Sequence, residues 1–213
     1  MTKHEPDFAL NRPGALIAAL PAVLGFVPEN SLVLVSLEGG ALGSVMRADL
    51  SEELASRVEQ LAELAATAKP QAAIAVIVDS AGAHCPVCNE EHRMLCSALT
   101  AALAEHDIVL WAAHVVDQIA VGGRWHCADG CGSAGEVDDP SASPMAVAAV
   151  LDGRRLYPRR VDLQAVIAVD DPVRSDGLVD LLERQAAARE IAYRADPAGC
   201  GRRDVQHAMA AAV

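Results

Sequence analysis

The chain has 213 residues, 52% of them hydrophobic but only 3% aromatic, so aliphatic side chains must fill its core. Its 17 basic and 29 acidic residues give a net charge of −12, which argues against a surface that binds nucleic-acid phosphates. Met1–Phe8 lacks a secretory signal pattern, and no apolar run reaches the ~20 residues that cross a bilayer. We therefore expect a cytoplasmic protein that binds neither nucleic acid nor membrane.

The first predicted elements are a helix and a β-hairpin. Apolar residues recur at helical spacing over Pro13–Leu24, although Pro21 is expected to kink or split this helix. Ser31–Leu37 is mostly apolar, which is typical of a strand buried on both faces. Gly39-Gly40 then supplies the turn into a second strand, Leu42–Asp49.

The middle of the chain predicts helices that alternate with strands. Ser51 is the expected N-cap of a helix, and Ala72–Val78 follows as a wholly apolar strand. The loop Asp79–Cys88 leads to a second helix, capped by Asn89, and then to a long strand over Ile108–Val121. A strand, a helix and a strand in succession predict a right-handed parallel crossover. We therefore expect three mutually parallel strands in one sheet: Leu42–Asp49, Ala72–Val78 and Ile108–Val116.

A second hairpin is predicted where Gly122-Gly123 supplies a two-residue turn. The returning strand is expected to run antiparallel to the strand before the turn. This pairing places Cys127 opposite Gln118 and Cys131 opposite His114.

Together these elements predict an α/β fold with a single mixed β-sheet. Two β-hairpins are linked through strand-helix-strand crossovers, helices pack against the sheet, and the C-terminal part is helical. The loop Ala128–Pro140 joins the second hairpin to a short helix that Ser143 caps. Residues 1–10 are expected to form a flexible N-terminal arm, 11–160 the α/β domain, and 161–213 a helical C-terminal extension packed on the same domain.

Three stretches of the chain are specific enough to compare with known families. The first is PGALIAALPAVLGFVPENSLVLVSL followed by LGSVMRADL, the second is Gly123-Arg124-Trp125 with Cys127 and Cys131, and the third is Ser143–Arg154. In this order they resemble a family from high-GC Gram-positive (actinobacterial) bacteria, catalogued as domain of unknown function 4192. The resemblance covers most of residues 11–160. It implies a cytoplasmic α/β domain without established activity, and it supplies no catalytic residues.

The cysteines are the most informative side chains for chemistry. In the cytoplasm, six cysteines are more often thiols or metal ligands than structural disulfides. Cys85-Pro86-Val87-Cys88 has the spacing of a metal knuckle, and Cys127 and Cys131 form a second pair. Both pairs are expected near the carboxyl ends of parallel strands, so they predict a four-thiolate zinc site. Three adjacent histidines are substitute ligands: His84, His92 and His126.

Two other interpretations of the cysteines remain open. Unligated thiols, or a redox couple within Cys85–Cys88, together fit the sequence about as well as zinc. Cys96 lies too far along its helix from Cys88 to share an ion with it, and it is expected to be a small buried side chain.

Three aspartates offer a different kind of site. Asp49, Asp79 and Asp117 each follow apolar strand residues, and open α/β sheets bind ligands beyond the carboxyl ends of their strands. If two of these carboxylates lie close together, their pKa values separate and one can act as a base. The alternative is that each aspartate only forms the turn that ends its strand. The sequence contains no P-loop, nucleophile elbow or H-E-x-x-H motif.

The sequence therefore supports two functions. The first is a non-catalytic cytoplasmic regulatory or protein-binding module, with a zinc or redox site at its cysteines and a protein partner or a second copy as its ligand. The second is an enzyme with a carboxylate-lined site formed by Asp49, Asp79 and Asp117. A clustered carboxylate pocket would favour the enzyme, whereas a filled edge and an exposed apolar patch would favour the module.

Overall fold

The computed structural model describes residues 12–39, 41–168, 177, 180–181 and 183–187. The chain divides into two units, Met1–Val166 and Ile167–Val213. The predicted arm 1–10 and most of the predicted extension 161–213 lie outside the described residues. The β-sheet belongs entirely to the first unit.

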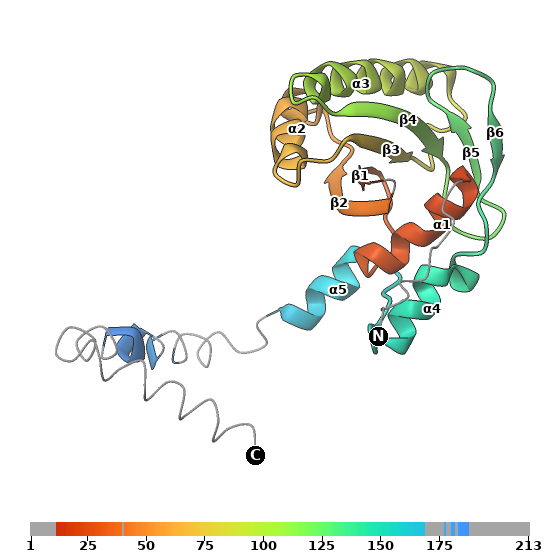
Figure 1. Cartoon of the computed structure of the whole chain (residues 1–213). Helices are drawn as coiled ribbons and strands as arrows, with labels where there is room; N and C mark the ends of the chain where they lie inside the picture. The colour runs from red at the N-terminus through yellow and green to blue at the C-terminus, as the bar shows by residue number, and fades with distance from the viewer. Residues whose placement is uncertain (1–11, 40, 169–176, 178–179, 182, 188–213) are drawn as a thin grey trace. The chain divides into compact units, whose positions relative to one another are not determined.

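A six-stranded mixed sheet forms the centre of the first unit (Figure 1). Its strands are β1 (Ser31–Glu38), β2 (Ala41–Asp49), β3 (Ala72–Val78), β4 (Val109–Val116), β5 (Arg124–Cys127) and β6 (Ala134–Glu136), in the order β2-β1-β3-β4-β5-β6. β1 is antiparallel to both β2 and β3, β3 is parallel to β4, and β5 and β6 continue antiparallel. β2, β3 and β4 therefore run in the same direction, which confirms the predicted mixed sheet.

Helices cover both faces of this sheet (Figure 1). α1 (Pro13–Leu24) lies on one face, and α2 (Val58–Ala66) and α3 (Pro86–Ala104) cover the other. α4 (Pro144–Leu151) packs on α1 through small side chains, and α5 (Arg160–Ile167) follows it in the chain. Among the described residues, none of the helices is both long and apolar enough to cross a membrane.

β1 and β3 are buried because each is an apolar run between two helical layers. Val33 and Val76 are paired across these strands and face α1, and each is 0% exposed. Leu34 and Ile77 point to the opposite face, where they pack with α2 and α3. The core predicted from the apolar runs is therefore present.

Two helices differ from the prediction: α1 in its middle, at Pro21, and α2 at its start. α1 is continuous through Pro21, so the predicted split does not occur. The helix expected directly after Ser51 begins later, because a 3-10 turn at Ala55–Arg57 precedes α2 and the Ser51 side chain makes no capping bond there.

α3 begins at Pro86 rather than after Asn89, which corrects the predicted boundary. Pro86 lacks a backbone N–H and therefore suits the first helical position. The carbonyl of Cys85 accepts the first helical hydrogen bond, from the backbone N–H of Asn89, at 2.9 Å. Cys85 consequently caps the helix, and the Asn89 side chain is available for contacts with other elements.

The second hairpin has a longer turn than predicted. The Oδ1 atom of Asp117 accepts two backbone N–H groups, from Gln118 at 2.6 Å and from Arg124 at 2.8 Å. These bonds end β4 early and hold a loop in place of the two-residue turn. As a result Cys127 pairs with His114 rather than with Gln118.

β6 forms inside the segment that was expected to be a loop. The indole N–H of Trp125 donates to the carbonyl of Glu136 at 3.2 Å. A Cβ on Gly135 would stand 3.1 Å from three atoms of that indole, so glycine allows the ring to lie flat against the strand. The aromatic cover over a glycine explains why this short segment pairs with β5.

Candidate functional site

The first candidate site is the turn after β5, here called the Cys127 loop (residues 127–133). The backbone N–H of Cys127 donates to the carbonyl of Ser133 at 2.9 Å and closes the loop. Gly130 and Gly132 have φ angles of 75° and 82°, which glycine adopts without steric cost. They flank Cys131 and bend the chain on both sides of it. The sequence Cys-Ala-Asp-Gly-Cys-Gly-Ser thus favours a tight turn that brings two thiols together.

Three donor atoms converge in the Cys127 loop. The sulfurs of Cys127 and Cys131 and a carboxylate oxygen of Asp129 all lie within 4.8 Å of one another, so this group could hold a metal ion. In the described part of the chain, no other group of three His, Cys, Asp or Glu side chains meets this spacing. The backbone N–H of Cys131 donates to Asp129 Oδ1 at 2.9 Å and holds the carboxylate in the turn.

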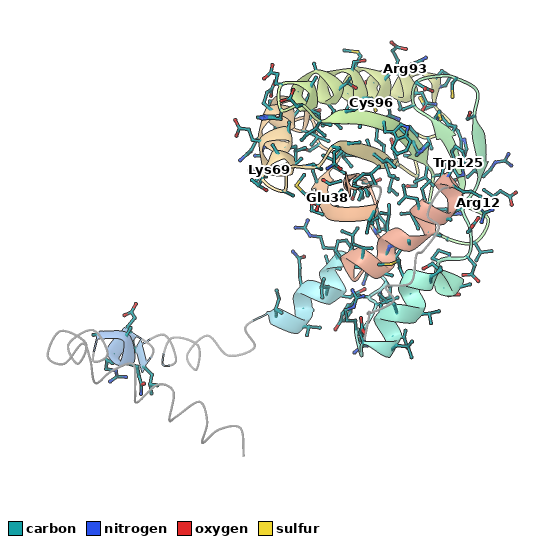
Figure 2. All side chains as sticks on the ribbon, viewed as in Figure 1. Arg12, Glu38, Lys69, Arg93, Cys96 and Trp125 are labelled. Carbon is teal, nitrogen blue, oxygen red and sulfur yellow. The ribbon has the colours of Figure 1, made fainter. Side chains whose placement is uncertain are left out.

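His114 lies beside this group. The β4–β5 pairing places it opposite Cys127, with its Nδ1 atom 3.8 Å from the Cys127 sulfur. A thiolate and an imidazole that share one tetrahedral zinc are about 3.6 Å apart. The His114 ring is buried and meets the ring of Trp125 edge-on, with centroids 5.1 Å apart; Trp125 is labelled in Figure 2. Burial lowers the pKa of His114, which favours the neutral imidazole that metal ligation requires.

Acidic groups are crowded in the Cys127 loop. Burial and the neighbouring Cys131 thiol raise the pKa of Cys127 to about 11. The pKa of Asp129 is lowered, chiefly because the backbone N–H of Cys131 hydrogen-bonds to its carboxylate. A bound cation would relieve this crowding, because it stabilises thiolates and carboxylate at once.

Cys85 and Cys88 form a separate pair at the start of α3. Cys85 is the N-cap residue, with an extended backbone, and Cys88 lies in the first turn. The pKa of Cys85 is lowered, chiefly by the nearby backbone N–H of Cys88 and further by the Cys88 thiol. The pKa of Cys88 is raised, first by its contact with Cys85 and then by burial. The two thiols therefore differ in acidity.

The two cysteine pairs lie in different groups. Cys85 and Cys88 do not belong to the three-donor group of the Cys127 loop. The hairpin register explains this separation: Cys127 pairs with His114, within β4, and not with Gln118, beyond the carboxyl end of that strand where Cys85 and Cys88 were expected to meet it. The four-cysteine zinc site stays a prediction, and the five cysteines that the structure describes are free thiols.

The three histidines considered as substitute ligands lie around the start of α3. His92 is buried, and its Nε2 atom lies 3.1 Å from Asp79 Oδ2. His84 Nε2 lies 3.5 Å from Asp117 Oδ2. His126 points to α3, and its pKa is lowered by burial first and then by the charges of the other two histidines. The three rings therefore contact residues at the carboxyl edge of the sheet and at the start of α3, and none of them belongs to the three-donor group of the Cys127 loop.

The three aspartates of the carboxyl edge have different surroundings. Asp79 and Asp117 are neighbours because β3 and β4 end side by side, and each accepts two backbone N–H groups of its own turn. Asp49 lies beyond β1 and pairs with Arg47 at 2.6 Å and with Arg160 at 3.2 Å. Turn formation accounts for most contacts of Asp79 and Asp117, and the Asp79–His92 and Asp117–His84 contacts are the exceptions.

Two members of the Cys127 site, Asp129 and His114, are not evident as ligands from the sequence. The Cys-x-Asp-x-Cys spacing is a local signal that can identify Asp129. No local signal identifies His114, because its position depends on the register of the hairpin. Cys96, expected to be buried, is a half-buried side chain of α3 that packs against the core, and burial raises its pKa to about 11 (Figure 2).

Comparison with known proteins places the whole described fold in one family. No curated protein and no solved structure matches the chain. A family model matches residues 13–213, which include the opening helix and hairpin, the Cys127 loop and α4. The chain therefore belongs to this family, which is described as a domain of unknown function, DUF4192.

Proposed function

We propose that the chain is a cytoplasmic regulatory or protein-binding module with a structural, non-catalytic zinc site in the Cys127 loop. Cys127, Asp129 and Cys131 bind the ion. His114, whose Nδ1 atom lies 3.8 Å from the Cys127 sulfur but outside the three-donor group, supplies the fourth ligand once its ring turns toward them. The observation that carries the proposal is the convergence of three donor atoms within 4.8 Å of one another. Thiolate, imidazole and carboxylate ligands together suit zinc in four-coordinate geometry.

The position of these ligands supports a structural role for the ion. The Cys127 loop joins β5 to β6, and His114 comes from β4, so the ion would tie three strands together. Four protein ligands leave no open position for a substrate, which is the arrangement of structural rather than catalytic zinc. The geometry thus favours a module over a metalloenzyme.

An open strand edge supports the protein-binding part of the proposal. β5 pairs only with the last residues of β4, so within the described residues no strand pairs with the outer edge of Val109–Ala112. Val109 is 64% exposed there and Trp111 is 71% exposed. A strand of another chain can extend a sheet at such an edge. We expect a protein partner or a second copy to bind, rather than nucleic acid, because the net charge is −12.

Elemental analysis of the full chain, purified without added metal, tests the zinc site. We expect about one zinc per chain, lost in Cys127→Ser and in Cys131→Ser. Cys85→Ser and Cys96→Ser are matched controls that should keep the metal. Zinc loss in Cys85→Ser would instead support the four-cysteine site. Full zinc content in the Cys127→Ser/Cys131→Ser double variant would refute the proposal.

Trp125 provides an independent readout of the same site. The chain has two tryptophans, so Trp125 is the remaining fluorophore in a Trp111→Phe variant. Zinc added to the metal-free variant should change this fluorescence, because it would fix the His114 ring against the indole. Further substitution of His114→Gln should abolish the response. Magnesium, which prefers oxygen ligands, should have no effect at the same concentration.

The alternative function, an enzyme at the carboxyl edge, draws on the Asp79–His92 contact. Asp49 is engaged by two arginines and is separated from the other carboxylates by β1, so the predicted trio does not line one pocket. A hollow of 340 Å³ lies instead at the amino end of β4, next to Asp107 and Val109. The observations therefore give more support to the module.

A further inference from the structure

The geometry points to a second activity at the start of α3: Cys85 and Cys88 form a dithiol that exchanges with disulfides, and Asp79 accepts the proton of Cys88. This inference goes beyond the proposed zinc site, uses none of its ligands and does not depend on it.

The position of the two thiols on the helix is the first observation. Cys85 caps α3, which is 19 residues long, and Cys88 lies in its first turn. A spacing of three residues at a helix start places two Cα atoms within the ~4.4–6.8 Å that a disulfide spans. The partial positive charge of a helix N-terminus stabilises a thiolate there. A disulfide can therefore close across the first turn without movement of the sheet.

The two sulfurs are not equivalent in position: Cys85 stands at the N-cap, ahead of the helix, whereas Cys88 lies inside the first turn and packs against Gly82 beside Asp79. This difference in position, together with their acidity, assigns their roles. The nearby backbone N–H groups of Cys88 and, more weakly, of Val87 lower the pKa of Cys85. Cys88 is the weaker acid, because its contact with Cys85 and its burial raise its pKa. Cys85 is therefore the attacking thiolate, and Cys88 is the thiol that resolves the intermediate.

A carboxylate lies beside Cys88. A Cβ built on Gly82 would stand 3.0 Å from the Cβ of Cys88 and still closer to Asp79 Oδ2, so both side chains pack against the bare glycine. The negative charge of Asp79 also contributes to the raised pKa of Cys88. Asp79 Oδ1 is occupied by the backbone N–H groups of Ala81 and Gly82, so Oδ2, whose one further contact is with His92, is the oxygen that accepts a proton.

His92 completes a path for that proton. Its Nε2 atom lies 3.1 Å from Asp79 Oδ2, and its Nδ1 atom lies 3.5 Å from Asn89 Oδ1. The Asn89 amide nitrogen donates to the carbonyl of Ala83 at 3.1 Å, which turns Oδ1 toward the ring. Both nitrogens of His92 therefore face acceptor oxygens, so an additional proton can be shared within the Asp79–His92 pair.

The exchange proceeds in two steps. The Cys85 thiolate attacks one sulfur of a substrate disulfide R–S–S–R; the S–S bond breaks, a mixed disulfide forms on Cys85, and RS⁻ leaves and takes a proton from water. Cys88 then gives its proton to Asp79 and attacks the Cys85 sulfur, and the second RS⁻ leaves and takes that proton from Asp79, which returns to the carboxylate. Overall the dithiol loses two protons and two electrons, and the substrate becomes two thiols.

The surroundings of the thiols favour access from solvent. Cys85 and Cys88 are half-buried, and Val87 between them is 68% exposed. An exposed apolar side chain between the two thiols suits a polypeptide that carries a disulfide. Small disulfides such as oxidised glutathione have the same reactive group, so the experiment must compare the two.

The sequence makes the reaction easy to map. Tryptic cleavage of the chain places Cys85 and Cys88 on the peptide 58–93, Cys96 on 94–124, and both cysteines of the Cys127 loop on 125–154. After incubation of the reduced full chain with oxidised glutathione, we expect an internal disulfide in 58–93 only. The Cys127→Ser/Cys131→Ser variant should give the same result, so failure of the zinc proposal would not affect this one.

Trapping variants test the assigned roles. Cys88→Ser should accumulate glutathione on Cys85, and Cys85→Ser should accumulate at least tenfold less on Cys88. Dithiothreitol-driven reduction of insulin, a disulfide-bonded polypeptide, should be lost in both variants and unchanged in Cys96→Ser. Reduction of glutathione disulfide but not of insulin would restrict the substrate to small disulfides. Equal trapping at Cys85 and Cys88, or no internal disulfide in the wild type, would overturn the inference.

The role of Asp79 needs its own readout. Asp79→Asn keeps an oxygen for the backbone N–H groups but removes the proton acceptor, so it should slow closure of the internal disulfide by roughly tenfold or more. It should leave the first step, mixed-disulfide formation in a Cys88→Ser background, nearly unchanged. Asp117→Asn is the matched control, because Asp117 holds two backbone N–H groups in the same way at the next strand. Equal effects of both substitutions would show that Asp79 is only structural.

Discussion

Val76 lies between the neighbouring strands β1 and β4, its side chain packs in the core on the α1 face of the sheet, and it is 0% exposed. Truncation to alanine removes two methyl groups and leaves a cavity, so Val76→Ala should lower the free energy of unfolding by roughly 1–3 kcal/mol in urea titrations. Val87→Ala removes the same atoms from a side chain that is 68% exposed. It should change stability by no more than about 0.5 kcal/mol. Equal costs would contradict the assigned core.

The acidity of single thiols gives a second test at the residue scale. The pKa of Cys85 is lowered from its ordinary 9.0 by the backbone N–H of Cys88, whereas burial raises that of Cys96 to about 11. The thiolate is the form that reacts, so a lowered pKa means faster alkylation at a given pH. In the Cys88→Ser chain, which keeps that N–H, the iodoacetamide rate at Cys85 should reach half its maximum below pH 9.0. The rate at Cys96 should still rise at that pH, and the reverse order would contradict the two environments.

At the scale of elements, two arginines pair with the exposed carboxylate of Asp49 but differ in their own burial. The Arg47 side chain on β2 is only 11% exposed, pairs with Asp49 at 2.6 Å and donates to the buried Ser31 hydroxyl at 2.7 Å. Arg47→Ala removes a half-buried donor from the Ser31 hydroxyl and leaves Asp49 with Arg160 alone, so it should cost roughly 1–3 kcal/mol. Arg160, from α5, pairs with the same carboxylate but is 46% exposed. Arg160→Ala should cost less than about 1 kcal/mol, and chemical denaturation distinguishes the two.

The elements of the sheet could be predicted because their signals are local. The apolar runs of β1 and β3 give strands that are buried on both faces, and α1 ends at Gly25, with φ of 83°, as such a glycine allows. The start of α3 could not be placed as easily, because Asn89 and Pro86 both carry start signals. Tertiary contact decides between them, since the Asn89 side chain bonds Ala83 rather than the helix end.

The candidate sites could be predicted from the sequence less fully than the fold. Both cysteine pairs are visible as spacings, but the distance between them depends on the hairpin register. That register is set by the Asp117 carboxylate, which captures the backbone N–H groups of Gln118 and Arg124. The sequence of such a turn does not differ from that of other polar loops, so the hydrogen bonds of Asp117 could not be predicted from it. This register places His114 opposite Cys127, and Cys85 and Cys88 lie outside the three-donor group of the Cys127 loop.

At the scale of the first unit, β4 connects the two proposed sites. Its carboxyl end lies beside the Asp79 turn that precedes α3, and its His114 lies opposite Cys127. Two thiol sites a few residues apart along one strand would normally compete for the same metal or oxidant. Here their chemistry differs, because one sulfur pair lies at a helix N-terminus and the other in a turn with a carboxylate. We therefore expect metal at one site and disulfide exchange at the other.

This separation leads to a prediction about the stability of the whole chain. A ligand that binds only the native state stabilises it by about 2.7 kcal/mol at a hundredfold excess over its Kd. For a chain of this size, that corresponds to a rise in Tm of about 5–10 °C. Zinc should produce such a rise in the reduced protein, measured against a sample with EDTA, because the ion would hold β4 to the loop between β5 and β6. Cys85→Ser should keep the full response, since its sulfur is not in the three-donor group. Cys127→Ser should lose it, and an equal rise in both variants would mean that zinc binds elsewhere.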